Sequence, residues 1–427
     1  MRVLFITPYF PPELGAAQTR IYELALRLQN KGHQVAVLTT FPNYPSGIVA
    51  REWRGHFFRK NVEHSMTIYR VWSYATPNRG FLKRILSQFS FALFSALTGI
   101  LIPRFDVMVI ESPPLFDGFA GVFLNAIKGT PYLFTVSDLW PESAVQMGML
   151  RNPFLIWLSK RIESLFYRRA AAVLALTAGI QQKIEAQGIA ASKVILFRNS
   201  VDCEFFRPGV GVHVLRRELG IGAQDFLVMY AGTFGLAHNL AKVLETAALF
   251  QASGNKRVRF VLAGDGAESD ALKSKAAELK LGNVIFLDPL PKSRMPELLN
   301  SSDVVLVPLR NLEIFRGALP TKMFEAMACG KPVILGLAGE AEQLIRDAGA
   351  GQCIAPENAT AMHDAVLRVM RDTEAARRMG ERGRDYVVRY FNRDDRAQEL
   401  CDVLEKVAQR EALDWTCVPD PERNSSH

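Results

Sequence analysis

Cysteine is scarce in this chain, and its few cysteines form no pattern. The 427 residues contain five of them, at positions 203, 329, 353, 401 and 417, with no C-x-x-C pair. An odd number of scattered cysteines indicates neither a disulfide framework nor a zinc site defined by sequence spacing. A reducing, cytoplasmic compartment is the simplest assumption.

Several catalytic signatures are also absent from the sequence. There is no D-x-D triplet, which commonly holds a metal beside a nucleotide, and no His/Asp/Glu cluster at metal-ligand spacing. There is no G-x-S-x-G elbow of a serine hydrolase. The first apolar run leads into FPPELGAA rather than into a glycine fingerprint, which disfavours a nicotinamide dehydrogenase. We expect metal-independent chemistry with no cofactor.

Acidic residues are outnumbered by basic ones, 43 to 51, which gives a net charge of +8. Such an excess suits acidic partners: nucleotides, phospholipid headgroups or nucleic acid. The aromatic-basic signatures of common nucleic-acid modules are missing, so nucleic acid is the weakest of the three.

One long run is uncharged, ILSQFSFALFSALTGILI at 85–102, and basic residues flank it. It is consistent with a crossover helix buried against a sheet, with an interfacial membrane contact, or with a spanning helix. Its serines and its position before the strand-like DVMVIES favour the first interpretation. The basic flanks agree with peripheral attachment to the inner face of the plasma membrane. The N-terminal MRVLFITPYF lacks the features of a signal peptide, so we expect a cytoplasmic location.

Short β-rich runs alternate with helical patterns along the chain, which predicts parallel βαβ units. Near 200 the pattern is interrupted by RNSVDCEFFRPGVGV, and a second alternating series follows. The fold class is therefore α/β, with two doubly wound Rossmann-like domains facing across a cleft. The predicted strands are 3–7, 35–39, 106–111, 132–136, 173–176, 226–230, 258–263, 284–287, 304–308 and 333–335.

The predicted domains follow from this interruption. Residues 1–200 form an N-terminal Rossmann-like domain, and 201–385 form a C-terminal Rossmann-like domain. Residues 386–410 are expected to be a helical segment that packs back toward the N-terminal domain. Residues 411–427 are polar and irregular, so we expect a disordered tail.

Ligands of doubly wound sheets bind beyond the carboxyl ends of the strands. In AGTFGLAHN (231–239), Gly232 and Gly235 lie between a predicted strand and a helix, where a phosphate could approach the backbone. AGDGAES (263–269) has a similar arrangement. Either loop could instead be a simple tight turn, and for 263–269 the turn is the favoured interpretation.

Residues 318–334, ALPTKMFEAMACGKPVI, predict a short helix opened by Pro320 and ended before a buried strand. At about 100° per residue, the apolar Met323, Phe324 and Met327 fall on one side. Thr321, Lys322 and Glu325 gather on the other side. This polar face is either an ordinary wet surface or part of a site.

SDLWPES (137–143) places Asp138 and Trp140 after an apolar strand. The carboxylate could accept a hydrogen bond from a sugar hydroxyl, or it could simply cap a helix. Arg310, Arg316 and Lys322 could together neutralise a pyrophosphate leaving group.

Taken in order, these segments resemble those of the retaining GT-B glycosyltransferases of family four, especially the bacterial members that build surface polysaccharides. The resemblance extends through about residue 405 and includes FPPELGAAQTR, RNSVDCEFFRP, SDLWPES, AMACGKPVI and GEAEQLIRDAGAG. Ser200 stands where the family usually has glycine. Gly317 stands where the first glutamate of its E-x7-E pair would fall, and Thr233 and His238 stand where it usually has Arg and Lys.

The resemblance implies that 1–200 is the acceptor-side domain and that 201–385 binds the nucleotide sugar. It also implies the following residue roles. Glu325 would hold the ribose of the donor, and Arg316 and Lys322 would stabilise the departing diphosphate, while Asp138 would face the transferred sugar. Donor binding is implied for Gly232, Thr233, Gly235, His238, Gly264, Gly266, Leu287, Leu290, Pro320 and Thr321. An acceptor-side surface is implied for Glu13, Gly15, Ala16, Arg20 and Trp140.

The implied activity is transfer of a sugar, hexosyl or N-acetylhexosaminyl, from a nucleotide-diphosphate sugar, with UDP as the expected nucleotide. The implied acceptor is a lipid-linked saccharide in surface-polysaccharide or O-antigen assembly. Two alternatives share the fold: a UDP-sugar 2-epimerase, and a noncatalytic subunit that binds nucleotide sugars. Incubation with a UDP-sugar alone would distinguish the epimerase.

Overall fold

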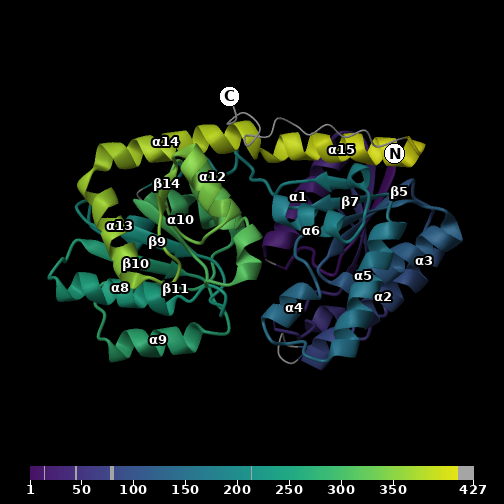
Figure 1. Cartoon of the computed structure of the whole chain (residues 1–427), viewed down its shortest axis with the longest axis horizontal. Helices are drawn as coiled ribbons and strands as arrows, with labels where there is room; N and C mark the ends of the chain where they lie inside the picture. Colours follow the sequence, from purple (N-terminus) through teal and green to yellow (C-terminus); the bar gives the residue numbers. More distant parts are fainter. Residues whose placement is uncertain (14, 44–45, 77–80, 213, 412–427) are drawn as a thin grey trace. The chain divides into compact units, whose positions relative to one another are not determined.

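The structure is a computed structural model, which describes residues 1–411 except 14, 44–45, 77–80 and 213. The chain divides into two units (Figure 1). The first comprises residues 1–198 together with the last helix from Asp394 onward, and the second comprises Asn199–Arg393. Each unit has its own sheet flanked by helices, so the predicted pair of doubly wound α/β domains is confirmed.

The sheet of the first unit has eight strands in the order β3-β4-β2-β1-β5-β6-β7-β8, and only β3 runs antiparallel to its neighbour. Residues of β1 alternate between two cores: Leu4 and Ile6 belong to one, Val3 and Phe5 to the other. Because both faces are covered, its central strands are almost continuously apolar. The strands are β1 Arg2–Ile6, β2 Gln34–Thr40, β3 Phe58–Glu63, β4 Met66–Val71, β5 Val107–Ser112, β6 Tyr132–Val136, β7 Ala172–Ala175 and β8 Val194–Leu196.

The helices of the first unit cover both faces of this sheet. They are α1 Ala16–Asn30, α2 Phe81–Leu101, α3 Gly118–Lys128, α4 Glu142–Gln146, α5 Pro153–Arg169, α6 Ala178–Ala186 and α15 Arg393–Gln409, with 3-10 turns η1 Arg51–Trp53, η2 Leu115–Asp117 and η3 Ala191–Lys193.

The second unit has a six-stranded parallel sheet in the order β11-β10-β9-β12-β13-β14. Its central strand β9 likewise sends alternate side chains to two cores. The strands are β9 Phe226–Ala231, β10 Val258–Ala263, β11 Val284–Leu287, β12 Val304–Pro308, β13 Val333–Gly336 and β14 Gly351–Cys353. The helices are α7 Val214–Glu218, α8 Ala241–Ala252, α9 Ser269–Glu278, α10 Met295–Ser301, α11 Thr321–Ala328, α12 Glu340–Ala348, α13 Ala359–Arg371 and α14 Thr373–Tyr390, with 3-10 turns η4 Lys292–Arg294 and η5 Glu313–Gly317.

The C-terminal helices differ from the predicted boundary at 385/386. Helix α14 continues to Tyr390, and the fully buried Val387 belongs to the core of the second unit, so residues 386–393 remain with that unit. From Asp394 on, α15 packs onto the first unit through buried residues such as Leu400 and Leu404. Of the predicted tail, residues 412–427 lie outside the described part of the chain.

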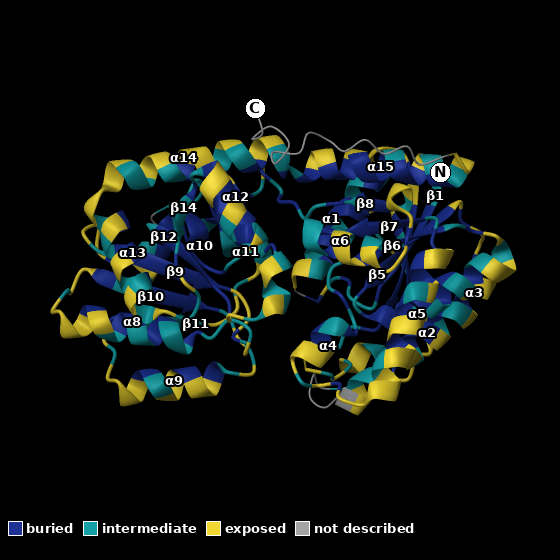
Figure 2. Ribbon diagram, in the orientation of Figure 1, coloured by how far each residue is buried: buried dark blue, intermediate teal, exposed yellow. Residues whose placement is uncertain are grey.

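Helix α2 differs from the predicted buried crossover in its exposure. It does precede β5, and Phe91 and Ala92 are buried, but only a third of its most apolar window is inside the protein. Figure 2 shows that much of α2 is exposed. A row of its apolar side chains at helical spacing is exposed: Leu82, Leu86, Phe89, Leu93, Leu97 and Ile100. Among the described residues, α2 is the one helix long and apolar enough to cross a membrane.

Two glycine turns at the carboxyl edge of the second sheet lie in direct contact. Gly232 follows β9 and Gly264 follows β10, with φ values of +141° and +146°. A Cβ atom on Gly264 would lie 1.9 Å from the carbonyl oxygen of Gly232. A Cβ on Gly266 would lie 2.5 Å from the carbonyl oxygen of Phe234. Only glycine allows the two backbones to approach this closely.

Replacing Gly264 by alanine should therefore lower the free energy of unfolding by more than about 3 kcal/mol, because a steric clash with backbone adds to the strain of positive φ. Gly254→Ala is the matched control. Gly254 has φ +72° with no atom within 4 Å of an added Cβ, so we expect a loss of about 1 kcal/mol. Urea denaturation would measure both, and equal losses would contradict the close-approach argument.

Candidate functional site in the second unit and its counterpart in the first

Helix α11 presents the polar face that the sequence predicted. Pro320 precedes its first residue with φ −63°, a value that proline favours. Met323, Phe324 and Met327 are fully buried in the core of the second unit, which confirms their predicted side. Thr321, Lys322 and Glu325 are each partly exposed. The predicted division of the helix into an apolar and a polar face is correct.

Lys322 joins α11 to the end of β9. Its Nζ donates a hydrogen bond to the hydroxyl of Tyr230 at 2.8 Å and lies 4.1 Å from the centre of that ring. The Tyr230 hydroxyl in turn donates to the carbonyl oxygen of Thr233 at 2.8 Å. A Cβ on Gly232 would lie 2.7 Å from Nζ, so the ammonium group sits directly against the glycine turn. Burial lowers the pKa of Lys322 to about 7, although Glu325 opposes the shift.

Glu325 lies one turn further along α11 among three cations. Burial raises the pKa of its carboxyl group, while the charges of Arg393, Lys292 and Lys322 act to lower it. Burial lowers the pKa of Lys292 to about 8, with Arg393 as a second cause. Excess positive charge around one carboxylate is an arrangement that an added anion would stabilise.

His238 contacts Tyr230 but, unlike the cations around Glu325, it is uncharged. Its Nδ1 is 3.4 Å from the carbonyl oxygen of Pro308, and its ring contacts that of Tyr230 at 5.9 Å between centres. Burial and the charge of Lys322 lower its pKa to about 3. His238 is therefore neutral at physiological pH and can serve as a hydrogen-bonding group rather than as a cation.

The structure separates the two predicted diphosphate cations. Unlike Lys322, Arg316 is 61% exposed in its side chain and pairs with Glu313 at 3.1 Å. Its backbone carbonyl faces Gly339 at the start of α12, where a Cβ would lie 2.1 Å away. Arg310 is also exposed and lies 3.8 Å from Glu357.

The remaining predicted donor residues line the same carboxyl edge of the sheet. Thr321 accepts a hydrogen bond from Asn199 at 2.8 Å. Leu287 ends β11, and both Leu287 and Leu290 pack against the core beneath the edge. Thr233 and Gly235 belong to the loop that follows β9.

The first unit has its own polar group at the carboxyl edge. Arg20, predicted on the acceptor side, is buried and donates to Glu111 and to the Ser137 hydroxyl, the latter at 2.8 Å. Its guanidinium therefore holds α1 against the ends of β5 and β6. Asp117, in η2, is fully buried, and neither carboxylate oxygen has a hydrogen-bond partner among the described residues. Burial raises its pKa well above its ordinary value.

Asp138 and Trp140 have mainly local contacts. Burial raises the pKa of Asp138, and hydrogen bonds from Ser143 and the Leu139 backbone oppose the shift, so this carboxylate supports the start of α4. Trp140 packs edge-on against Phe116 at 5.1 Å. Gly15 and Ala16 form the first turn of α1, with Gly15 at its N-cap.

Glu13 borders an open hollow at the carboxyl edge of the first sheet, lined by both polar and apolar groups. Its carboxylate accepts a hydrogen bond from the backbone of Asn43 at 2.7 Å. The hollow contains about 600 Å³ of empty space, including its open mouth. It is lined by Pro8, Tyr9, Glu13, Thr40, Asn43, Ser73, Thr76, Arg84, Ser87, Gln88, Phe91 and Pro114.

Three residues of the second-unit site were missed from the sequence: Tyr230, Lys292 and Arg393. Tyr230 was read as part of a buried strand, which it is. Lys292 lies just beyond β11, so the rule that ligands bind at carboxyl ends could have found it. Arg393 is distant in sequence, and its hydrogen bonds to Ser200 depend on the tertiary fold.

Comparison with known proteins assigns both halves of the chain. Residues 15–200 match the glycosyl transferase 4-like domain, and residues 213–386 match the glycosyl transferases group 1. WcaI of Escherichia coli (strain K12), named as a glycosyl transferase of colanic acid biosynthesis, is 24% identical over 93% of this chain and its own full length. WbjE of Pseudomonas aeruginosa, named as a glycosyltransferase, is 24% identical over 66% of this chain and 70% of its own.

Solved structures show the same fold at low identity. Sucrose-phosphate synthase from Thermosynechococcus elongatus has a TM-score of 0.74 and 18% identity, covering 96% of this chain and 100% of its own. HepE of Anabaena, in complex with UDP and glucose, has a TM-score of 0.72 and 18% identity, covering 94% and 99%. WaaG, a glycosyltransferase involved in lipopolysaccharide biosynthesis, has a TM-score of 0.68 and 16% identity, covering 94% and 99%.

Two doubly wound units with these domain matches define a glycosyltransferase of the GT-B type. More narrowly, the chain belongs to family four of these enzymes, as the order of its sequence segments predicted.

The low pKa of Lys322 predicts a pH-dependent contribution to stability. Between about pH 7 and 10.5 the unfolded lysine binds a proton that the folded one does not, so this contribution grows more favourable as pH rises. Relative to Lys322→Met, the wild-type free energy of unfolding should gain about 2 kcal/mol from pH 7 to pH 9. Urea denaturation of both proteins at each pH would measure it, and a constant difference would contradict the assigned pKa.

Proposed function

We propose that the enzyme transfers a sugar, with retention of anomeric configuration, from a UDP-type nucleotide sugar to a lipid-linked saccharide in bacterial surface-polysaccharide assembly. The observation that carries the donor assignment is the group at the carboxyl edge of the second sheet. There Lys322 lies against a glycine turn, and Glu325 stands beside it. The names of WcaI and WaaG support the polysaccharide context, and the UDP complex of HepE supports the nucleotide.

The donor would bind with its two ends on different groups. The carboxylate of Glu325 accepts hydrogen bonds from the ribose hydroxyls, since an ionised acceptor makes the stronger bonds. Lys322 and the exposed main chain at Gly232 face the diphosphate. A diphosphate bound there would raise the pKa of Lys322, so that the lysine stays protonated. The protonated amine would then stabilise the negative charge of the leaving group as the glycosidic bond breaks. Lys292 adds a second cation to the ribose end.

The saccharide of the acceptor would enter the hollow that Glu13 borders in the first unit. Helix α2 lines that hollow with Ser87 and Gln88, while its exposed row of leucines and phenylalanine runs along the same helix. A saccharide attached to a lipid needs both environments, one polar and one apolar. The hollow therefore suits the sugar, and the apolar row suits the bilayer that carries the lipid.

A membrane surface is proposed for the three adjacent helices α2, α3 and α5. Helix α2 packs beside α3, and α3 beside α5 (Figure 2). Besides the row on α2, this surface exposes Phe123, Ile127, Phe154, Leu155, Trp157, Leu158 and Leu165. Its exposed or partly exposed cations are Lys83, Arg84, Lys128, Lys160, Arg161, Arg168 and Arg169. Apolar side chains with basic neighbours suit an anionic inner leaflet, so we propose a peripheral, cytoplasmic-face location.

Glu325→Gln tests the donor site. Loss of a charged acceptor should lower kcat/KM by about 10- to 100-fold, since a hydrogen bond to a charged group is worth about 1.5 to 3 kcal/mol. The assay offers a panel of nucleotide sugars with bacterial lipid extract and detects products by mass spectrometry. Glu374→Gln, an exposed glutamate of α14, should retain wild-type activity.

Two results of that assay would count against the proposal. Full activity of Glu325→Gln would remove Glu325 from the donor site. Conversion of a UDP-sugar to its 2-epimer without any acceptor would replace transfer by epimerisation.

The double substitution Leu93→Glu/Leu97→Glu tests the membrane surface. Flotation with phosphatidylglycerol-containing vesicles should show at least about 10-fold weaker binding, because burying each leucine is worth about 1.5 to 3 kcal/mol. Leu249→Glu, an exposed leucine of α8 in the second unit, is the control and should bind like the wild type. Equal binding of all three proteins would contradict the assignment of this surface.

A further inference from the structure

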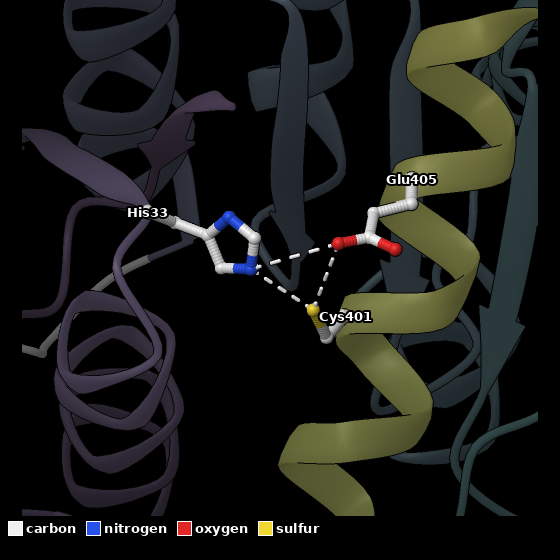
Figure 3. Close-up of side chains that lie close together, drawn as sticks. All are labelled: His33, Cys401 and Glu405. Atoms are coloured by element: carbon white, nitrogen blue, oxygen red, sulfur yellow. Dashed lines mark hydrogen bonds and ion pairs between the residues drawn. The ribbon is translucent and has the colours of Figure 1, made fainter.

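A histidine, a cysteine and a glutamate side chain lie close together in the first unit, at the contact between α15 and the turn that precedes β2 (Figure 3). His33 lies in that turn, and Cys401 and Glu405 are one helical turn apart on α15. The Nε2 atom of His33 is 2.9 Å from Sγ of Cys401 and 4.0 Å from Oε1 of Glu405. Sγ and Oε1 are 3.6 Å apart.

These separations are close to those of a tetrahedral metal site. With zinc–ligand distances of about 2.3 Å to sulfur and 2.0 to 2.2 Å to nitrogen and oxygen, neighbouring ligand atoms are about 3.4 to 3.6 Å apart. The Cys401–Glu405 separation already falls in this range. The other two differ by about 0.6 Å in opposite directions, so a small rotation of the His33 ring toward Glu405 corrects both.

The orientation and burial of the three residues also suit an ion. Nδ1 of His33 lies 3.4 Å from the Met1 amine nitrogen, so Nε2 is the ring nitrogen that faces the other two ligands. Cys401 and His33 are largely buried, so water has little access to the sulfur and nitrogen ligand atoms. The side chain of Glu405 is 50% exposed, so an ion can enter from solvent at that side.

We propose that His33, Cys401 and Glu405 bind one divalent, borderline-soft transition ion, Zn²⁺ being the expected one, with water as a fourth ligand. A thiolate together with an imidazole selects this class over Mg²⁺ or Ca²⁺, which prefer oxygen ligands. The thiol proton passes to solvent as the sulfur–metal bond forms. This site lies in the first unit and is separate from the donor site of the second.

The bound ion would fasten the end of the chain to its beginning. Cys401 and Glu405 belong to α15, while His33 leads into β2, which lies between β4 and β1 in the first sheet. Besides this cluster, an ion pair of Arg27 with Asp394 at 2.5 Å and apolar packing hold α15 in place. Binding to the folded state alone raises the free energy of unfolding with the logarithm of the free metal concentration once that concentration exceeds Kd.

The test uses the full chain, stripped with a chelator and kept reduced, and Co²⁺ as a spectroscopic probe. One equivalent should bind, with a thiolate-to-cobalt charge-transfer band and the intense visible bands of tetrahedral Co²⁺. Zn²⁺ should displace the Co²⁺ and raise the unfolding temperature. Cys401→Ser should lose the charge-transfer band and bind more than about 100-fold more weakly, since loss of even an outer partner commonly costs 10- to 100-fold.

Glu405→Gln is the variant least able to disturb folding, because its side chain is half exposed, and it should weaken binding at least about 10-fold. Asp402→Asn on the same helix and Cys353→Ser in the second unit are matched controls that should bind like the wild type. No uptake of Co²⁺ or Zn²⁺ by the wild type would overturn the proposal. So would uptake unchanged in both Cys401→Ser and Glu405→Gln.

Discussion

The contact between the glycine turns at 232 and 264 is the constraint on which the candidate donor site depends. Parallel strands bring the ends of β9 and β10 to one edge of the sheet, and the register pairs Ala231 with Ala263. The next residue of each strand must then pass its neighbour without a side chain between them. At Gly264 the missing Cβ lets the two turns approach, and at Gly232 the missing Cβ leaves room for the amine of Lys322 from α11. The two glycines therefore allow different close approaches, one of backbone to backbone and one of Lys322 to backbone.

The electrostatics of the site follow from this crowding. Lys322 loses hydration as it packs against Tyr230, so its charged form becomes less favourable. Glu325 is desolvated as well, yet the cations around it favour its ionised form. The candidate site therefore groups several cations around one carboxylate, an arrangement that suits the diphosphate of the proposed donor. An excess of positive charge favours binding of an anion, whereas His238 remains neutral throughout.

Much of the fold could be predicted from the sequence because buried parallel strands read as continuous apolar runs. Four strands were not predicted. β3, with sequence FRKNVE, is mostly exposed, and β8 and β14 have only three residues each. β4, with sequence MTIYRV, is largely buried, but Thr67 and Arg70 interrupt its apolar run. The polar face of α11 was predictable because helical geometry is local. Arg393 beside Glu325 was not, because it depends on how the chain returns after α14. His33 and Cys401 are separated by 368 positions, so no ligand spacing could have revealed their contact.

The return of α15 to the first sheet has a consequence for synthesis on the ribosome. The apolar surface formed by Val3, Phe5 and Leu24 is covered in part by Leu400 and Leu404. That surface is translated before the second unit, whereas α15 is translated only after the second unit. During this interval the nascent N-terminal sheet presents an incomplete core, which is the kind of surface that chaperones bind. Truncation near residue 393 would leave this apolar surface permanently exposed, because α15 supplies part of the core of the first unit.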